Sequence, residues 1–344
     1  MSTNHSKNSP MKSIAIALAM LALIPTLAMA QSTTTVYGVM DLNLNVDNGS
    51  KAAGRLVQIS SGQTGQSGSR IGFKGEEALG DGWSALYVLE AGILPDTGTS
   101  DQGGVLFGRS AFVGLSGRAG TIRLGRMATP AWTVQTRIDP FAIGLAGDMS
   151  RLFGTTGKRT DNTINYRSPT TNGVTAELAY AAGEQPGSTA KARHLGASLT
   201  YEMGPLLLTA SHDVANSNPV AAAPVIGTKT SLLGAVYDFG VVAVHLALDV
   251  NKNGLTLDTR DLLLGVTVPM ARGKIMADMI RKTDKAVGDA DAHMVALAYI
   301  YPLSSRTNLY TSYSHLSNQS KAKYQVELAG HTDTFYNVGM RHMF

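Results

Sequence analysis

Apolar and polar residues alternate with a period of two in segments of about ten residues along most of the chain. In residues 174–180, Val174, Ala176, Leu178 and Tyr180 share one face, opposite the polar positions between them. Residues 162–167, 194–201 and 242–249 repeat the pattern. Because successive side chains of a strand point to opposite faces, this period predicts β-strands with one apolar and one polar face. A shift of one residue would exchange the two faces, so the pattern also fixes the register.

The connections between these segments alternate between short turns and long polar loops. Tight turns rich in Gly, Asp and Pro lie at residues 80–82, 117–120, 169–173, 203–205, 238–240, 269–273 and 302–306. The long loops lie near residues 47–68, 94–104, 128–160, 183–191, 213–227, 251–259, 283–291 and 316–333. Seven short and eight long connections imply sixteen strands. An even number closes an antiparallel barrel with both termini on the short-turn side.

The polar face distinguishes a membrane barrel from a soluble β-sandwich, the alternative for an alternating all-β chain. A sandwich hides large apolar residues and exposes a charged face. Here the polar face carries small and hydroxyl residues, as a wet lumen would, and the other face repeats Leu, Val and Tyr, as a lipid-facing surface would. Tyrosines near strand ends would form girdles at the membrane interfaces, and these are Tyr37, Tyr87, Tyr166, Tyr180, Tyr201, Tyr237, Tyr299 and Tyr310.

The first thirty residues differ from the rest. Lys7 and Lys12 precede an apolar run that ends in Ala28-Met29-Ala30, which predicts a secretory signal peptide over 1–30 and a barrel domain over 31–344. A membrane anchor helix is the alternative, but Pro25 interrupts the run. The 344 residues contain no Cys, which excludes a disulfide scaffold, and 29 Lys and Arg against 25 Asp and Glu are too balanced for a nucleic-acid platform.

Several segments resemble the trimeric general-diffusion porins of Gram-negative outer membranes, most closely the betaproteobacterial type. They are TVYGVMD at 35–41, SRIGFKGEEALG at 69–80, LFGRSAFVGL at 106–115 and VGMRHMF at 338–344. The resemblance implies a homotrimer in contact with outer-membrane lipid and lipopolysaccharide. It further implies a water-filled channel for passive diffusion of small hydrophilic solutes and ions. In that family a C-terminal aromatic, here Phe344, is the assembly signal read by the barrel-insertion machinery; an ordinary edge strand ending in Phe is the alternative.

The longest loop, residues 128–160, is the expected constriction. It contains apolar residues such as Trp132, Phe141 and Phe153 that a free surface loop would not need. The resemblance implies that this third long loop folds into the barrel. Packing on a neighbouring subunit is the alternative. The predicted fold is therefore all-β, a transmembrane sixteen-stranded antiparallel barrel with an inward-folded third long loop.

Parity places several cations on the lumen face, because they are out of phase with the neighbouring apolar side chains. These are Arg70, Arg109 and Arg167, with Lys74 as a weaker candidate. The resemblance implies that such arginines converge opposite the constriction loop and give a weak anion preference. Arginine suits this task because it stays charged and binds carboxylate or phosphate with a planar fork. Separate salt-bridged or lipid-facing arginines are the alternative.

Asp139 and Asp148 in the long loop would oppose the arginines and set up a field across the pore. The loop departs from a mainly acidic constriction loop, since it also contains Arg137, Arg151, Lys158 and Arg159.

Catalytic motifs are missing from the sequence. It has no Gly-x-Ser-x-Gly elbow, no His-Glu-x-x-His pair and no Cys nucleophile, and its histidines are scattered without ligand spacing. We therefore expect no enzyme, no cofactor and no metal site. The alternative function is an outer-membrane adhesin or receptor that uses the barrel as a platform.

Overall fold

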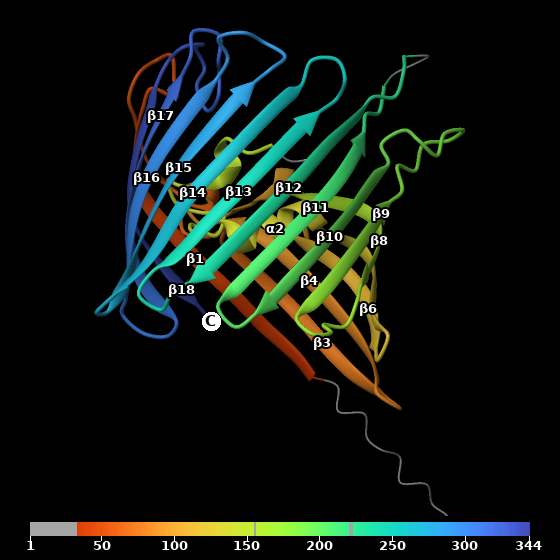
Figure 1. Cartoon of the computed structure of the whole chain (residues 1–344). Helices are drawn as coiled ribbons and strands as arrows, with labels where there is room; N and C mark the ends of the chain where they lie inside the picture. The colour runs from red at the N-terminus through yellow and green to blue at the C-terminus, as the bar shows by residue number, and fades with distance from the viewer. Residues whose placement is uncertain (1–32, 155, 220–222) are drawn as a thin grey trace, which may run out of the picture.

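The computed structural model describes residues 33–154, 156–219 and 223–344, which form a closed barrel of tilted antiparallel strands (Figure 1). Its sheet has 18 strands, of which β2 (Leu56–Ser60) and β5 (Thr99–Ser100) are short additions within long loops. The other sixteen, within the described residues, confirm the predicted barrel. They are β1 (Thr33–Asn48), β3 (Arg70–Gly80), β4 (Trp83–Leu94), β6 (Ser110–Gly117), β7 (Gly120–Ala128), β8 (Arg159–Arg167), β9 (Val174–Ala181), β10 (His194–Met203), β11 (Leu206–Asn216), β12 (Gly227–Asp238), β13 (Ala243–Lys252), β14 (Asp258–Met270), β15 (Gly273–Asp284), β16 (Ala292–Pro302), β17 (Thr307–Asn318) and β18 (Asp333–Met343).

Short turns and long loops alternate around the barrel as the sequence predicts. The turn between β3 and β4 shows why Gly is needed there, since Gly80 and Gly82 have φ values of 91° and 77°. The predicted signal peptide, residues 1–30, lies outside the described residues. Helical segments of the described chain are α2 (Pro130–Ile138) and the 3-10 turns η1 (Gly62–Thr64), η2 (Gln102–Gly104) and η3 (Met149–Arg151). None of the helices in this described part is long and apolar enough to cross a membrane.

The barrel closes where the last strand pairs with the first. β18 runs antiparallel to β1 from Val39 opposite Met343 to Asn48 opposite Thr334. The terminal residue extends this ladder, because Gly38 N–H donates to the Phe344 carbonyl at 3.0 Å and Phe344 N–H donates to the Gly38 carbonyl at 3.1 Å. The sequence prediction that the closing strand pairs with the first strand is therefore confirmed.

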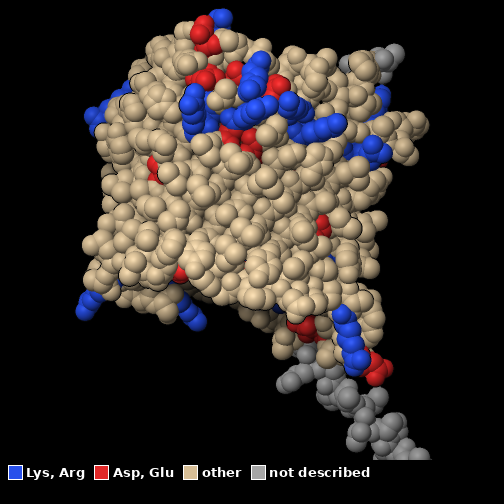
Figure 2. All heavy atoms as spheres, viewed as in Figure 1, with Lys and Arg blue, Asp and Glu red and all other residues tan. Residues whose placement is uncertain are grey.

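Side-chain exposure separates an outer apolar face from an inner polar face. On β13, Leu246 and Leu248 are 47% and 54% exposed, whereas Ala247 and Asp249 between them are buried. Figure 2 shows the consequence on the face in view: charged side chains gather toward the two ends of the barrel, and the band between them is almost uncharged. A broad exposed apolar band of this kind is what a lipid bilayer covers.

The connection between β7 and β8, here called the inner loop (residues 129–158), lies inside the barrel. Its helix α2 packs against the inner side of β10, β11 and β12 (Figure 1). Buried apolar residues of the loop, among them Val134, Ile138 and Met149, form one cluster with wall residues such as Leu232 and Leu263. The apolar composition of this loop is explained by its contact with the wall.

Two tyrosines predicted for the interfacial girdles point inward instead. The Tyr37 hydroxyl donates to Glu90 Oε2 at 2.9 Å, and the Tyr310 hydroxyl donates to the buried carboxylate of Asp41. Both have the parity of inward polar residues, as with Tyr310, which lies on the same face as Asn308 and Ser312. Strand-end position alone therefore does not identify a girdle tyrosine.

Candidate functional site: a basic cavity between the inner loop and the wall

The inner loop begins with a well-defined helix. Thr129 is the N-cap of α2, because its hydroxyl accepts a hydrogen bond from Trp132 N–H at 3.2 Å, and Pro130 occupies the first turn, where a missing N–H costs nothing. At the other end of the helix, the Ile138 carbonyl lies 2.9 Å from His245 Nδ1 on β13. The helix is thus held at both ends.

The rest of the inner loop is fastened to the opposite wall. Ala146 N–H donates to Ser312 Oγ at 3.0 Å, which links the loop to β17. Arg151 donates to Ser314 Oγ at 2.8 Å and forms an ion pair of 2.6 Å with the buried carboxylate of Asp333 on β18. Contacts to β10–β13 on one side and to β17 and β18 on the other span the barrel interior.

A cavity of about 720 Å³ lies between the inner loop and the wall formed by β3, β6 and β8. Four cations line it, and the lining includes one carboxylate, Asp101. The cations are Arg70, Arg109, Lys158 and Arg159. Positive charge therefore predominates along the lining, and we call this space the basic cavity.

Glu90 on β4 holds two of these arginines together. Arg109 Nε lies 2.7 Å from Glu90 Oε1, and Arg70 Nε lies 3.6 Å from Glu90 Oε2. Arg159 joins them, since its Nε donates to the Arg109 carbonyl at 2.9 Å. The sequence prediction brought Arg70 and Arg109 together correctly. It missed Arg159 as a wall residue, and alternation could not have found it, because a bulge in β8 between Thr160 and Thr163 shifts the register.

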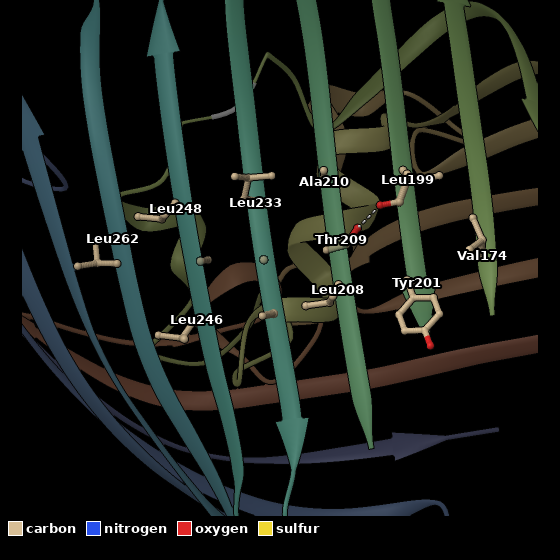
Figure 3. A pocket seen from close by; sticks show the side chains of 13 residues that line it. Val174, Leu199, Tyr201, Leu208, Thr209, Ala210, Leu233, Leu246, Leu248 and Leu262 are labelled. Carbon is tan, nitrogen blue, oxygen red and sulfur yellow. Dashed lines mark hydrogen bonds between the residues drawn. The ribbon is translucent and has the colours of Figure 1, made fainter. Parts of the chain in front are cut away.

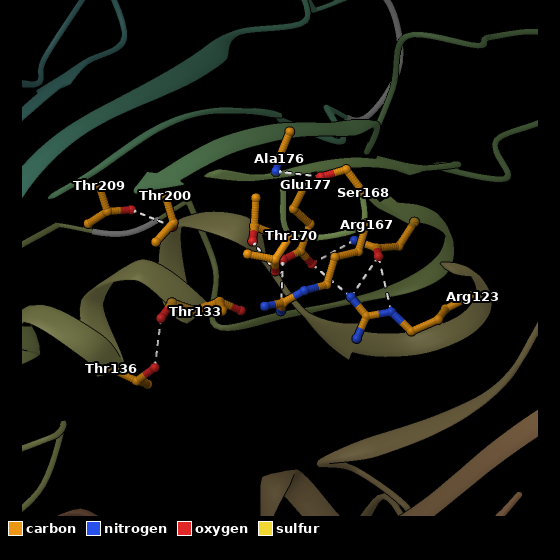
Figure 4. A network of polar contacts seen from close by, with 12 residues as sticks. Arg123, Thr133, Thr136, Arg167, Ser168, Thr170, Ala176, Glu177, Thr200 and Thr209 are labelled. Carbon is orange, nitrogen blue, oxygen red and sulfur yellow. Dashed lines mark hydrogen bonds and ion pairs between the residues drawn. The ribbon is translucent and has the colours of Figure 1, made fainter. Parts of the chain in front are cut away.

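Arg167 belongs to a different cluster, near the short-turn end of the barrel (Figure 4). It lies 3.9 Å from Glu177, which also binds Arg123 at 2.8 Å. Eight residues separate it from Arg159 along β8, which corresponds to about 26 Å of extended strand. The expected convergence of Arg70, Arg109 and Arg167 is therefore wrong in its third member, because parity gives the face of a strand and not the height along the pore.

Lys74 lies on the inward side of β3 but outside the basic cavity. Its Nζ is 5.4 Å from the centre of the Tyr37 ring, and the side chain is exposed. It is four residues from Arg70, or about 13 Å along the strand.

The two loop carboxylates do not face the arginines as predicted. Asp139 is buried and accepts hydrogen bonds from the N–H groups of Phe141, Ile143 and Met149 at 2.8 to 3.1 Å. Burial, with the neighbouring Asp148 charge, raises the pKa of Asp139 to about 8. Asp148 is also buried, accepts from Ser150 N–H at 2.7 Å, and has a pKa raised by burial. Both residues fold the loop, and neither lines the basic cavity.

Comparison with known proteins identifies the family. A family model described as Gram-negative porin matches residues 17–321. The chain belongs to the Gram-negative porin family. It is 33% identical to Outer membrane porin protein 32 of Delftia acidovorans and 29% identical to an outer membrane porin protein of Bordetella pertussis, in each case over 97% of this chain and 100% of the relative.

Solved structures agree with this assignment. An anion-selective porin from Comamonas acidovorans superposes with a TM-score of 0.81 and 28% identity, over 91% of this porin and 100% of that chain. A loop-deletion mutant of OmpT of Vibrio cholerae, at 14% identity, shares the fold with a TM-score of 0.70 over 91% of this porin and 99% of that chain. The predicted betaproteobacterial resemblance is confirmed, and this porin is a multi-pass protein of the Gram-negative outer membrane.

The C-terminal Phe344 of this porin lies at the short-turn end with its ring over Gly38 of β1, where any Cβ would overlap the ring. The ring is 47% exposed on the outer face, which also carries Tyr336, Val338 and Met340. The structure thus explains why Gly occupies position 38. Recognition of Phe344 by insertion machinery stays a prediction.

Proposed function

We propose that this porin is a water-filled channel for passive diffusion of small hydrophilic solutes and ions, with a weak anion preference set in the basic cavity. The observation that carries the proposal is the charge of that cavity, where Arg70, Arg109, Lys158 and Arg159 outnumber the nearby carboxylates Glu90 and Asp101. The superposed porin from Comamonas acidovorans, described as anion-selective, supports the same sign of preference.

The inner loop is the constriction in this proposal. A sixteen-stranded barrel leaves an aqueous channel wider than a small solute, so something must narrow it for the wall charges to act. Contacts of the loop with His245, Ser312 and Asp333 support a position across the interior. An anion that passes Arg109 or Arg159 at about 6 Å is stabilised by roughly 0.7 kcal/mol in a water-like dielectric, enough to bias flux without trapping the solute.

The assembly that we propose is a homotrimer in contact with lipid and lipopolysaccharide. It rests on the family, whose model matches residues 17–321, and on the many exposed large apolar side chains of the outer face, which need lipid or other subunits around them. Phe344 would serve as the assembly signal during insertion. Porins of this family are channels, and we propose no catalytic activity.

Planar-bilayer recording of the purified porin tests the proposal. We expect stepwise conductance without any added partner and a reversal potential in a KCl gradient that reports preference for chloride. A variant with Arg70→Gln, Arg109→Gln and Arg159→Gln should lose that preference. The matched control removes three exposed arginines at short turns, with Arg118→Gln, Arg272→Gln and Arg306→Gln. If the inserted barrel does not conduct, the proposed channel function is wrong, and the alternative function, a surface adhesin that uses the barrel as a platform, is favoured.

A further inference from the structure

The basic cavity has two sides of different chemistry. Its wall side carries the guanidinium groups of Arg70, Arg109 and Arg159. Its other side is formed by the inner loop, whose lining residues there are mostly apolar. They are Trp132, Ala142 and Ile143, with Thr136 and Lys158 beside them. A solute in the cavity therefore meets positive charge on the wall and apolar surface on the loop.

Helix α2 turns two different faces to its surroundings. Val134 and Ile138, four residues apart, are buried against the barrel wall. Trp132 and Thr136, also four residues apart, share another face and line the basic cavity. Lys158 Nζ lies 4.6 Å from the centre of the Trp132 ring, so a cation of the loop is in direct contact with apolar surface. The helix thus contributes to the core with one face and to the cavity with the other.

Ala142 and Ile143 hold an uncommon backbone conformation beside the cavity. Their φ values are 51° and 58°, which few residues other than Gly adopt and which is exceptional for a β-branched Ile. Asp139 stabilises this conformation, because its carbonyl accepts from Ala142 N–H at 2.9 Å and its carboxylate accepts from Ile143 N–H at 2.8 Å. Gly or Asn would adopt it at less cost. The turn itself therefore does not explain the apolar side chains at these positions, and strained backbone of this kind is common at ligand sites.

Apolar side chains elsewhere in the barrel have an evident partner. On the outer face they meet lipid, as in the apolar groove of about 590 Å³ over β10–β14, where leucines surround Ala210 and the Thr209 hydroxyl is turned to the Leu199 carbonyl (Figure 3). Inside the barrel they pack between the inner loop and the wall. Ala142 belongs to neither group, because it is exposed inside the barrel and lines a cavity rich in cations. A solute with an apolar part would cover it.

The wall cations leave hydrogen-bond donors available for an anion. Arg109 uses its Nε for Glu90, and Arg159 uses its Nε for the Arg109 carbonyl. Among the residues that the structure describes, the Nη atoms of these two arginines form no hydrogen bond or ion pair. A guanidinium group binds a carboxylate through two parallel N–H donors. Arg109 and Arg159 can therefore bind a carboxylate while their Nε contacts hold them in place.

From these two sides we propose that the basic cavity selects carboxylates that carry a compact apolar body over carboxylates whose body is hydroxylated. The carboxylate lies against Arg109 and Arg159, and the apolar body lies against Ala142 and Ile143. The cavity, at about 720 Å³, has room for a cyclohexane ring. This inference rests on the proposed channel function and names the solute class that the channel favours. About 50 Å² of ring surface placed against the loop corresponds to about an eightfold gain in affinity.

The test compares cyclohexanecarboxylate with quinate, which has the same ring and charge but a hydroxylated body. Each anion is added to the purified porin in a planar bilayer in KCl at neutral pH, where both acids are ionised, and the concentration that halves the conductance is measured. We expect cyclohexanecarboxylate to reach half-block at about one-eighth of the quinate concentration. Arg159→Gln should weaken the block by both anions and leave their ratio unchanged, because it acts on the carboxylate alone.

Two variants test the apolar side of the cavity. Ala142→Asn puts an amide on this side with a residue type that tolerates positive φ, and should lower the eightfold ratio to about twofold. Ile143→Asn makes the same change at the neighbouring position. The control Ala271→Asn is the same substitution at an exposed short-turn residue with a φ of 30°, and its ratio should equal that of the parent. Conductance in KCl like that of the parent shows that the inner loop of each variant is in place.

The outcomes distinguish this inference from the channel function. Equal half-block concentrations for the two anions would overturn the inference, as would a stronger block by quinate. A ratio that neither Asn variant lowers would also overturn it, since the loop would then not contact the solute. A parent that does not conduct, or that shows no preference for chloride, would contradict the proposed function itself and remove the basis of the inference.

Discussion

Replacing Glu90 by Gln should make the channel more anion-selective. Glu90 lies 2.7 Å from Arg109 Nε and 3.6 Å from Arg70 Nε, so its carboxylate offsets part of the positive charge at the basic cavity. Gln keeps the shape of the side chain and an oxygen acceptor for Arg109, and its NH2 group takes the place of Oε2, where it can donate to the Tyr37 hydroxyl. The substitution therefore removes one negative charge and changes little else.

The magnitude follows from Coulomb's law with screening. An ion that passes about 6 Å from one unit charge in water changes in energy by about 0.7 kcal/mol, reduced to about 0.4 kcal/mol at 0.1 M salt and about 0.1 kcal/mol at 1 M. Chloride gains what potassium loses, so the permeability ratio responds to twice this energy. We expect about a fourfold rise in the chloride-to-potassium ratio near 0.1 M and about 1.4-fold near 1 M.

The assay is the reversal potential across a planar bilayer with a KCl gradient, measured around 0.1 M and around 1 M. The control is Glu77→Gln, which removes an exposed carboxylate with outward parity from neighbouring β3. Its ratio should equal that of the parent. A ratio for Glu90→Gln that is unchanged or lower at 0.1 M would refute the assignment of the basic cavity to the ion path.

Three further perturbations probe the inner loop and the register. Arg151→Ala breaks the 2.6 Å ion pair between the inner loop and Asp333 of the wall, and should give larger, noisier conductance steps. The control Arg137→Ala removes an ion pair to the mostly exposed Glu202 and should leave the steps unchanged. Parent-like steps for both variants would contradict the role of Arg151 in anchoring the loop. Cysteine at Arg167 should react with a water-soluble thiol reagent and cysteine at Ile164 should not, and the reverse labelling would mean a shifted register. Burial raises the pKa of Asp139 to about 8, so its contribution to loop stability is complete below about pH 4 and is lost as pH rises through 8. Protease cleavage of the loop should therefore increase from pH 6 to pH 9 in the parent and increase less in Asp139→Asn, in which the buried Asp148 of the same loop remains.

The strands and turns were predictable because their signals are local. Alternation along residues 242–249 reports the two faces of β13 directly, and the Met203-Gly204-Pro205 turn joins β10 to β11 where the pattern stops. Closure was predictable for a different reason: a barrel has no free edge, so its last strand must meet its first. The fold and the strand boundaries thus follow from the two-residue alternation and from the turn residues that end it, without knowledge of distant contacts.

The arrangement of the polar side chains inside the barrel was harder to predict. The alternation along a strand gives the face on which a residue lies, but neither its height along the barrel axis nor its partners. Arg167 has the predicted face but binds Glu177 near the short-turn end. Tyr37 has the predicted strand-end position, but its ring lies inside the barrel over Gly72 of β3 and its hydroxyl bonds to Glu90 of the next strand, β4. The position of Arg167 could have been predicted, since the short turn at 169–173 begins two residues after it. The partners of both residues are on other strands, and these depend on register, shear and tilt that a single sequence does not display.

The carboxylates of the inner loop illustrate how local chemistry can outweigh a functional expectation. A loop inside a barrel has few ladder partners, so its own side chains must satisfy its backbone N–H groups. Asp139 and Asp148 do this, each accepting from the N–H two residues ahead, as Asp commonly does in turns. Because Pro140 has no N–H, the donors to Asp139 begin at Phe141. An Asp in such a loop is therefore weak support for a field across the pore. With both carboxylates taken up by the loop backbone, the cations of the basic cavity face fewer opposing charges, which is why we expect the anion preference to survive despite the acidic residues of the loop.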